Sequence, residues 1–150
     1  MIIREIRHGD RDEWLRMRDA LWPDALADHD DETRRFFEER QDAPVVFVAD
    51  ADGALIGFLE LDFRTYAPGC QSSPVPFIEG WYVDPAHRGR GIGRSLIAAA
   101  EECARRAGYD EIASDAEVEN SDGAAAHRAV GFEEIERVIC FRRSLKDEPR

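Results

Sequence analysis

Residues 87–96, HRGRGIGRSL, place three arginines and three glycines in ten positions and lead directly into an apolar stretch. Glycine lets the backbone approach a ligand closely, and the N-terminus of a following helix adds partial positive charge. Arginine side chains can bind phosphate oxygens through paired hydrogen bonds. This composition indicates a site for an anionic ligand, and an ordinary turn at the start of a helix is the alternative.

Two common nucleotide-binding motifs do not match this stretch. A Walker A loop requires GxxxxGK[ST], which is absent from the sequence. A Rossmann fingerprint requires GxGxxG followed by an acid about 20 residues later. Here the glycines are spaced GxGxG, and the strand expected before them lies mid-chain after a hairpin. The anion is therefore not predicted to be bound in either of these two ways.

The distribution of charge is uneven along a chain whose net charge is −12. Nine acids and one base (Arg128) lie within residues 108–136, whereas residues 85–100 contain Arg88, Arg90, Arg94 and no acid. The overall charge disfavours binding to nucleic acid or to an anionic membrane. An acidic region beside a basic loop suits an anionic cofactor together with a cationic substrate, and a solvated acidic face is the alternative.

The chain of 150 residues is long enough for one domain with a hydrophobic core. No run approaches the roughly 18 apolar residues of a membrane span, and the first residues lack the apolar region of a signal peptide. Cys70, Cys103 and Cys140 are far apart and form no CxxC motif, which argues against a disulfide framework and a zinc site. We expect a cytoplasmic protein whose thiols pack among apolar side chains.

Alternating and helical patterns predict an α/β fold in which one mixed sheet is flanked by helices. We expect residues 1–145 to form one domain and residues 146–150 to be a disordered tail. The histidines at 8, 29 and 87 are expected in exposed loops. Strands are predicted over 2–7, 44–50, 54–66, 75–83, 110–118 and 132–143, and helices over 11–22, 30–40, 91–107 and 121–130.

The stretch VDPAHRGRGIGRSL at 83–96 closely resembles the coenzyme A pyrophosphate loop of the GCN5-related N-acetyltransferase superfamily. Arg88, Gly91 and Gly93 occupy the defined positions of the family pattern [RQ]-x-x-G-x-[GA]. Downstream, Asn120 and the pair at 131–132 match the second half of that pattern, and the predicted order of strands is the family's order. The resemblance covers nearly the whole chain.

This resemblance implies acetyl-CoA as cosubstrate, no metal and no covalent acyl-enzyme. It implies that strands 75–83 and 110–118 splay apart, so that pantetheine pairs with the strand at 81–83 and backbone N–H groups at 88–94 hold the pyrophosphate. The cofactor-binding residues that it implies are Trp81, Tyr82, Val83, Arg88, Gly89, Arg90, Gly91, Ile92, Gly93, Arg94, Ser95 and Asn120.

A second resemblance indicates which class of amine accepts the acetyl group. LWP at 21–23, GCQSSP at 69–74, FIEG at 77–80, ASDA at 113–116 and EIERV at 134–138 are similar to the aminoglycoside 6′-N-acetyltransferases of the chromosomal, homodimeric branch. The resemblance implies a homodimer and a drug site lined by Trp22, Tyr66, Glu79, Asp115 and Glu136, with Glu136 reaching across the dimer. A polycationic sugar independently requires carboxylates for its charge and aromatic rings for its faces.

The expected reaction is direct attack of the neutral amine on the thioester. Asp115 is the first candidate to accept the proton, directly or through water, and Glu79 is the second. The backbone N–H of Val83 is placed to polarise the thioester carbonyl. Many family members protonate the leaving thiolate with a tyrosine at the position of His127 here, so His127, a water or no general acid are all left open.

Other functions remain possible on the residues alone. One is an acetyltransferase for another small amine, such as a polyamine or an amino acid, or for a protein or peptide amine. The other is a module that binds acetyl-CoA without catalysis. Intact acids at positions 79 and 115 argue against the second, and the richness in acidic residues disfavours a peptide acceptor.

Overall fold

Five strands form one mixed sheet in the order β1-β2-β3-β4-β5 within the described residues of the computed structural model, 1–39 and 44–147. The first four strands pair antiparallel, and β5 pairs parallel with β4. This architecture confirms the predicted fold class. The strands are β1 (Ile2–Glu5), β2 (Val45–Ala51), β3 (Ala54–Arg64), β4 (Val75–Val83) and β5 (Ala113–Ser114).

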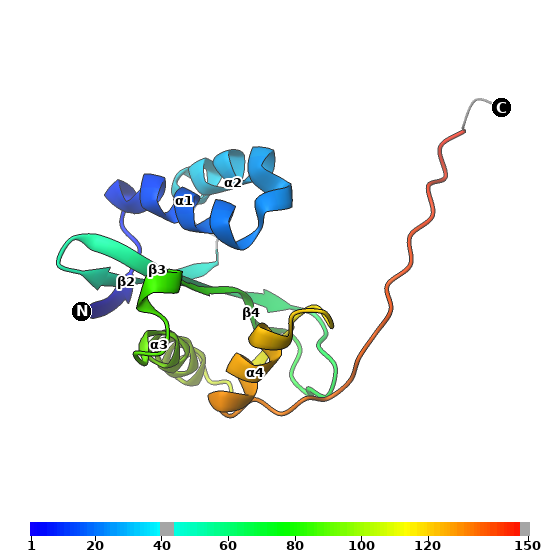
Figure 1. Cartoon of the computed structure of the whole chain (residues 1–150). Coiled ribbons are helices and arrows are strands. Elements are labelled where there is room, and N and C mark those ends of the chain that lie inside the picture. Colours follow the sequence, from blue (N-terminus) through cyan, green and yellow to red (C-terminus); the bar gives the residue numbers. More distant parts are fainter. Residues whose placement is uncertain (40–43, 148–150) are drawn as a thin grey trace. The chain divides into compact units, whose positions relative to one another are not determined.

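Helices cover both faces of this sheet (Figure 1). Phe58 of β3 contacts Trp22 on the side of α1, whereas its neighbour Gly57 faces Leu96 of α3. Successive residues of a strand point to opposite faces, so α1 and α3 lie on opposite sides. The helices are α1 (Arg11–Leu21), α2 (Leu26–Glu38), α3 (Ile92–Arg106) and α4 (Ser121–Ala129), with short 3-10 helices at His8–Asp10, Pro23–Ala25 and Pro85–His87.

The main core lies between the sheet and the first two helices. Trp14 of α1 makes edge-on contacts with Phe36 and Phe37 of α2, as their helical spacing predicts. His29, expected in an exposed loop, is instead buried on the inner face of α2, where Nδ1 lies 2.9 Å from Asp19 Oδ1. That prediction was wrong because α2 begins at Leu26, earlier than its apolar spacing indicates.

The chain divides into two compact units, Met1–Ala116 and Glu117–Arg150. In the second unit, residues 132–147 form neither helix nor strand, so the strand predicted over 132–143 was wrong. An alternating sequence becomes a strand only when another strand satisfies its backbone groups, and no described residue pairs with it. The last residues of the predicted tail, 148–150, lie outside the described residues.

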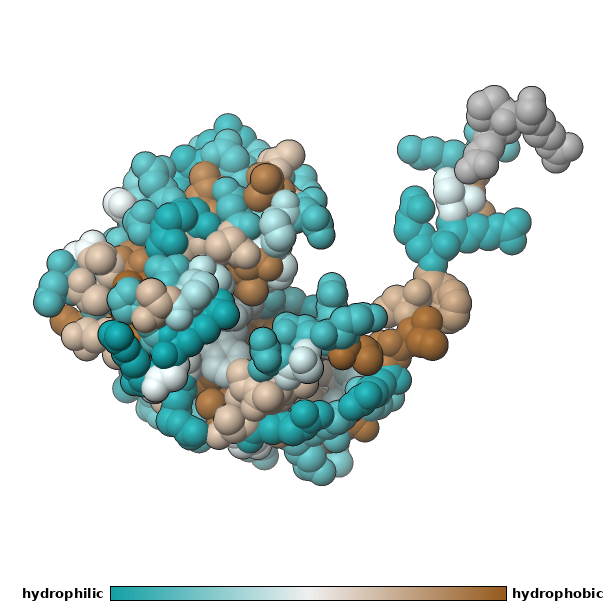
Figure 2. Space-filling view, viewed as in Figure 1, coloured by the Kyte–Doolittle hydropathy of each residue, from teal (hydrophilic) through white to brown (hydrophobic). Residues whose placement is uncertain are grey.

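The unpaired segment carries exposed apolar side chains. Ile135, Val138, Ile139 and Phe141 are all exposed, and Figure 2 shows brown, hydrophobic side chains along the segment. Cys140 is exposed among them, which contradicts the expected packing role of this thiol, whereas Cys70 and Cys103 are half-buried.

None of the helices in the described residues is long and apolar enough to cross a membrane. Within the same residues, no group of three or more His, Cys, Asp or Glu side chains is arranged to hold a metal ion.

Candidate active site

The loop between β4 and α3 has the geometry that its glycines predict. Gly89 and Gly91 have φ values of 78° and 82°, in the left-handed region that favours glycine, and Gly91 is the N-cap of α3. A Cβ on Gly93 would lie 3.1 Å from Trp81 Cζ2, so the helix packs closely against β4 there. The first turn of α3 thus directs N–H groups without helical carbonyl partners towards the loop.

Two side chains hold this loop against β4. Arg88 Nε donates a 2.8 Å hydrogen bond to the carbonyl oxygen of Val83, and its guanidinium lies 5.7 Å from the ring of Tyr82. Trp81 Nε1 donates to the carbonyl oxygen of Gly93 at 3.1 Å. Arg90 on the loop and Arg94 in the first turn of α3 are exposed, and their charges add to the positive end of the helix.

The edge of β4 opens next to this loop. Its parallel pairing with β5 consists of Phe77 with Ala113 and Ile78 with Ser114 and does not continue along the strand. Opposite β3, Glu60 pairs with Gly80 and Leu61 with Ile78, so Glu79 is the extra residue of a β-bulge. Residues 79–83 therefore form a strand edge that β5 does not cover, as the predicted splay requires.

Glu79 and Asp115 lie together through the register of the two strands. Ile78 pairs with Ser114, the last residue of β5, so Glu79 and Asp115 each directly follow a paired residue. Arg64, at the end of β3, donates hydrogen bonds of 2.9 and 2.6 Å to the two oxygens of Glu79 and lies 3.8 Å from Asp115 Oδ2. Its guanidinium carbon also lies 3.6 Å from the ring centroid of Phe77.

The hydrogen bonds from Arg64 to Glu79 raise the pKa of the guanidinium above its ordinary value. Both oxygens of Glu79 are engaged by this fork, whereas Asp115 is 68% exposed and has the longer contact of 3.8 Å with the same guanidinium. Of the two predicted carboxylates, Asp115 is therefore the one with more capacity to accept a proton or a hydrogen bond.

Trp22, at the end of α1, lies over the bulged part of β4. A Cβ on Gly80 would lie 2.6 Å from Trp22 Cη2 and 3.0 Å from Glu60 Oε2, so only glycine leaves room for both. The ring is half-buried, beside the residue that follows Glu79. Tyr66, by contrast, is 70% exposed just after β3.

Beneath Trp22 lies a charged cluster that sequence reasoning missed. Arg18 NH2 lies 2.6 Å from Glu32 Oε2, and Arg18 Nε lies 3.3 Å from Glu60 Oε1. Glu60 is only 5% exposed, and burial raises the pKa of its carboxyl to about 7 although the charge of Arg18 lowers it. An acid in the otherwise apolar run ALIGFLEL was the signal that would have identified Glu60.

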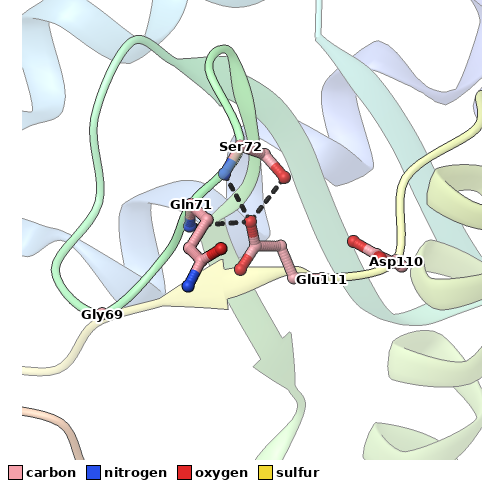
Figure 3. Close-up of a pocket in the computed structure, with 5 residues that line it drawn as sticks. All are labelled: Gly69, Gln71, Ser72, Asp110 and Glu111. Atoms are coloured by element: carbon pink, nitrogen blue, oxygen red, sulfur yellow. Dashed lines mark hydrogen bonds between the residues drawn. The ribbon is translucent and has the colours of Figure 1, made fainter.

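Glu111 anchors the loop between β3 and β4 (Figure 3). Its Oε2 accepts hydrogen bonds from the backbone N–H groups of Gln71 and Ser72, at 2.9 and 2.5 Å, and from the Ser72 hydroxyl. The hydrogen bonds from Ser72 lower the pKa of Glu111. An open pocket of about 410 Å³ lies here, lined by Gly69, Gln71, Ser72, Asp110 and Glu111.

Three predicted site residues belong to the second unit. Asn120 Oδ1 accepts a hydrogen bond from the Gly123 N–H at 2.9 Å and so caps α4. His127 Nδ1 lies 2.7 Å from the carbonyl oxygen of Gly123, which only accepts, so Nδ1 carries the proton. Glu136 is exposed in the segment without regular structure. The first unit thus brings together Trp22, Glu79 and Asp115, while roles for Asn120, His127 and Glu136 stay predictions.

Comparison with known sequences gives consistent matches. The sequence model of the acetyltransferase (GNAT) family matches residues 14–132. An aminoglycoside N(6′)-acetyltransferase type 1 from Stenotrophomonas maltophilia is 46% identical over 96% of this chain and 94% of that protein. A protein of the same name from Klebsiella aerogenes is 42% identical over 96% of this chain and 97% of its own length.

Solved structures agree with the sequence matches. AAC(6′)-Iy in complex with the bisubstrate analog CoA-S-monomethyl-acetylneamine has a TM-score of 0.87 and 39% identity, covering 95% of this chain and 97% of that chain. The aminoglycoside 6′-N-acetyltransferase AAC(6′)-IG from Acinetobacter haemolyticus has a TM-score of 0.88 and 36% identity, covering 97% of this chain and 100% of that chain.

Proposed function

The chain belongs to the acetyltransferase (GNAT) family, and we propose that it transfers the acetyl group of acetyl-CoA to the 6′-amino group of aminoglycosides. The observation that carries this proposal is the pair of carboxylates, Glu79 and Asp115, at the open edge of β4, the strand that leads into the glycine-rich loop. The proposal is supported by relatives named aminoglycoside N(6′)-acetyltransferase and by a solved structure of AAC(6′)-Iy with the bisubstrate analog CoA-S-monomethyl-acetylneamine.

The residues on the α3 side fit acetyl-CoA. The N–H groups of the first turn of α3 and the exposed Arg90 and Arg94 suit a pyrophosphate. The backbone groups of Trp81 and the carbonyl oxygen of Val83, on the edge that β5 leaves uncovered, suit the amides of pantetheine, since a strand edge pairs with another extended chain. The cosubstrate supplies the activated acetyl group as a thioester.

The residues around Glu79 and Asp115 fit a polycationic sugar. Glu79 and Asp115 provide negative charge for ammonium groups, and Trp22 and the exposed Tyr66 provide rings for the sugar faces. The net charge of −12 also speeds the encounter with a polycation.

In the proposed mechanism, Asp115 orients the neutral 6′-amine, whose nitrogen attacks the thioester carbonyl. The N–H of Val83 stabilises the negative charge that develops on the oxygen. Once the C–N bond has formed, Asp115 accepts the proton that the nitrogen loses, directly or through a water. Collapse of this intermediate breaks the C–S bond, forms the amide and releases CoA as a thiolate, which takes a proton from water or from a doubly protonated His127. Glu79, held by Arg64, contributes charge and position rather than proton transfer.

A free-thiol release assay with acetyl-CoA tests the proposed function. The acceptors are kanamycin A, tobramycin, paromomycin, which has a hydroxyl at the 6′ position, spermidine and a lysine-bearing peptide. Turnover of kanamycin A and tobramycin without paromomycin is the expected result. Turnover of spermidine or the peptide alone would assign the enzyme to another acceptor class.

We also propose that the protein is a cytoplasmic homodimer. The exposed apolar residues Ile135, Val138, Ile139 and Phe141 lie on a segment with a strand-like sequence and no paired strand, which a second copy would cover. Free thiols are compatible with a reducing compartment.

Light scattering after size exclusion tests the dimer. The full chain is expected to have twice the monomer mass, and Ile139→Asp/Phe141→Asp to have the mass of one chain. Glu133→Gln, on the same segment, is the matched control and should not change the mass. A monomeric wild-type protein with full activity would contradict this part of the proposal.

A further inference from the structure

The guanidinium of Arg18 lies between two indole rings. Its central carbon is 5.5 Å from the ring centroid of Trp14 and 5.2 Å from that of Trp22. Trp14 is fully buried in the core, whereas Trp22 is half-buried at the end of α1. Both distances are within the range of cation–π attraction, so Arg18 links the outer ring to a ring that the core holds.

Carboxylates from two other elements hold Arg18 in turn. Glu32 of α2 and Glu60 of β3 contact it at 2.6 and 3.3 Å, and both Arg18 and Glu60 are buried. The desolvation of a buried ion pair often exceeds its attraction, so apolar side chains of similar size would stabilise the fold at least as well. The buried pair thus calls for a role other than stability.

Glu60 also limits the position of Trp22 directly. Its Oε2 and the indole of Trp22 share the space above Gly80, which has no side chain. His29 lies on the ring as well, with 5.7 Å between ring centroids, and Phe58 contacts it edge-on at 6.2 Å. The ring is therefore confined by Arg18, Glu60, His29 and Phe58, beside the bulge that carries Glu79.

We propose that Arg18 and Glu60 are positioning residues that fix the ring of Trp22 over Gly80 as a wall of the acceptor site. The pair acts through Trp22 and does not contact the reacting atoms. This inference rests on the proposed function for the identity of the acceptor, but the position of the ring can be tested without it.

The first test compares Michaelis constants. Removing one partner would leave a buried charge, so the variant is Arg18→Met/Glu60→Gln, which removes both charges and keeps the approximate volume. We expect the KM for kanamycin A to rise about tenfold, as the loss of one cation–π contact allows, while the KM for acetyl-CoA changes less than about twofold. A KM for kanamycin A within about twofold of the wild-type value would overturn the inference.

The matched control is Arg4→Met/Asp10→Asn. Arg4 and Asp10 form another largely buried ion pair, at 2.7 Å, which lies at β1 away from Trp22. This variant should lose stability without a selective rise in the acceptor KM. An equal rise in both double variants would show that destabilisation alone produces the effect, and would also overturn the inference.

The second test reports on the ring without any acceptor. Fluorine NMR of the full chain labelled with 5-fluorotryptophan has one signal for each of the three tryptophans, and Trp22→Phe identifies its signal. In Arg18→Met/Glu60→Gln, the Trp22 signal is expected to shift or broaden while the Trp81 signal stays unchanged. An unchanged Trp22 signal in a folded variant would overturn the inference, even if the wild-type protein acetylates no aminoglycoside. If the double variant does not fold, Glu60→Gln alone is measured with the same criterion, since Arg18 keeps its ion pair with Glu32 in that variant.

Discussion

Arg64 and Glu79 form a two-pronged ion pair, in which Nε and NH2 of the guanidinium donate to the two carboxylate oxygens at 2.9 and 2.6 Å. The pair joins the end of β3 to the bulge of β4, and Asp115 of the neighbouring chain segment lies 3.8 Å from the same guanidinium. One arginine therefore sets the relative position of both candidate carboxylates.

Replacing Arg64 should impair the acceptor side of the reaction. In Arg64→Gln, Glu79 loses both hydrogen bonds, and we expect kcat/KM for kanamycin A to fall about tenfold with the KM for acetyl-CoA unchanged. Arg64→Lys should not restore activity, since an ammonium cannot form the planar fork. Arg34→Gln, an exposed arginine paired with Asp31 on α2, is the control. A higher affinity for kanamycin A in Arg64→Gln would instead mean that Arg64 competes with the substrate.

The two carboxylates should differ in their effect on turnover. Asp115→Asn removes the more available proton acceptor, so its kcat should fall about a hundredfold, while Glu79→Gln should lower kcat about tenfold or less. Steady-state kinetics with saturating acetyl-CoA measures both. The exposed Asp110→Asn is the control for loss of charge. A larger loss of kcat in Glu79→Gln would exchange the two roles.

The left-handed backbone conformation of Gly91 should affect the binding of acetyl-CoA and not the binding of the acceptor. Its φ of 82° costs a residue with a Cβ about 1–2 kcal/mol, so Gly91→Ala should distort the loop at the start of α3. The KM for acetyl-CoA is expected to rise about tenfold and the KM for kanamycin A to stay unchanged. Gly53→Ala imposes similar strain at φ 95° in the turn between β2 and β3 and should leave both constants unchanged. Equal effects of the two variants would refute a specific role for the loop.

The buried carboxyl of Glu60 should stabilise the folded chain more at low pH than at neutral pH. Burial raises its pKa to about 7 from an ordinary value of 4.5, with Arg18 opposing the shift and Glu32, Glu79 and Asp62 adding to it. Between these pH values the folded chain keeps a proton that the unfolded chain releases. The stabilising contribution is therefore full below 4.5 and is lost as pH rises to about 7.

Urea unfolding of the wild type and Glu60→Gln at about pH 5 and about pH 8 measures this effect. The variant cannot titrate, so its stability relative to the wild type should increase at the higher pH, by on the order of 2 kcal/mol. Glu101→Gln, on the surface of α3, should show no such change. An equal stability difference at both pH values would mean that Glu60 titrates alike in the folded and unfolded chains.

Local sequence signals predicted most of the sheet and the helices. Both ends of the strand 75–83 were predicted correctly, because a loop with proline and serine precedes it and Asp-Pro follows it. The strand expected over 132–143 was wrong, since alternation shows that a segment can pair but not that a partner is present. The strand predicted over 110–118 is reduced to 113–114 for the same reason.

The candidate site was partly predictable. Glu79 and Asp115 were identified through the resemblance to the aminoglycoside 6′-N-acetyltransferases. An acid within an apolar strand requires a reason, and this rule would also have identified Glu60. Arg64 was missed because an arginine at a strand end resembles any surface charge. Its contact with Glu79, fifteen residues later, depends on the register of β3 and β4 and on the bulge.

The position of the acetyl group on the product tests the central claim most directly. Kanamycin A is incubated with the full-length enzyme and acetyl-CoA, and proton–carbon NMR of the purified product locates the new amide. We predict a single acetyl group on the 6′ nitrogen, seen as a downfield shift confined to the 6′ methylene protons. An acetyl group on another amine, or no product from kanamycin A while spermidine is acetylated, would contradict the account.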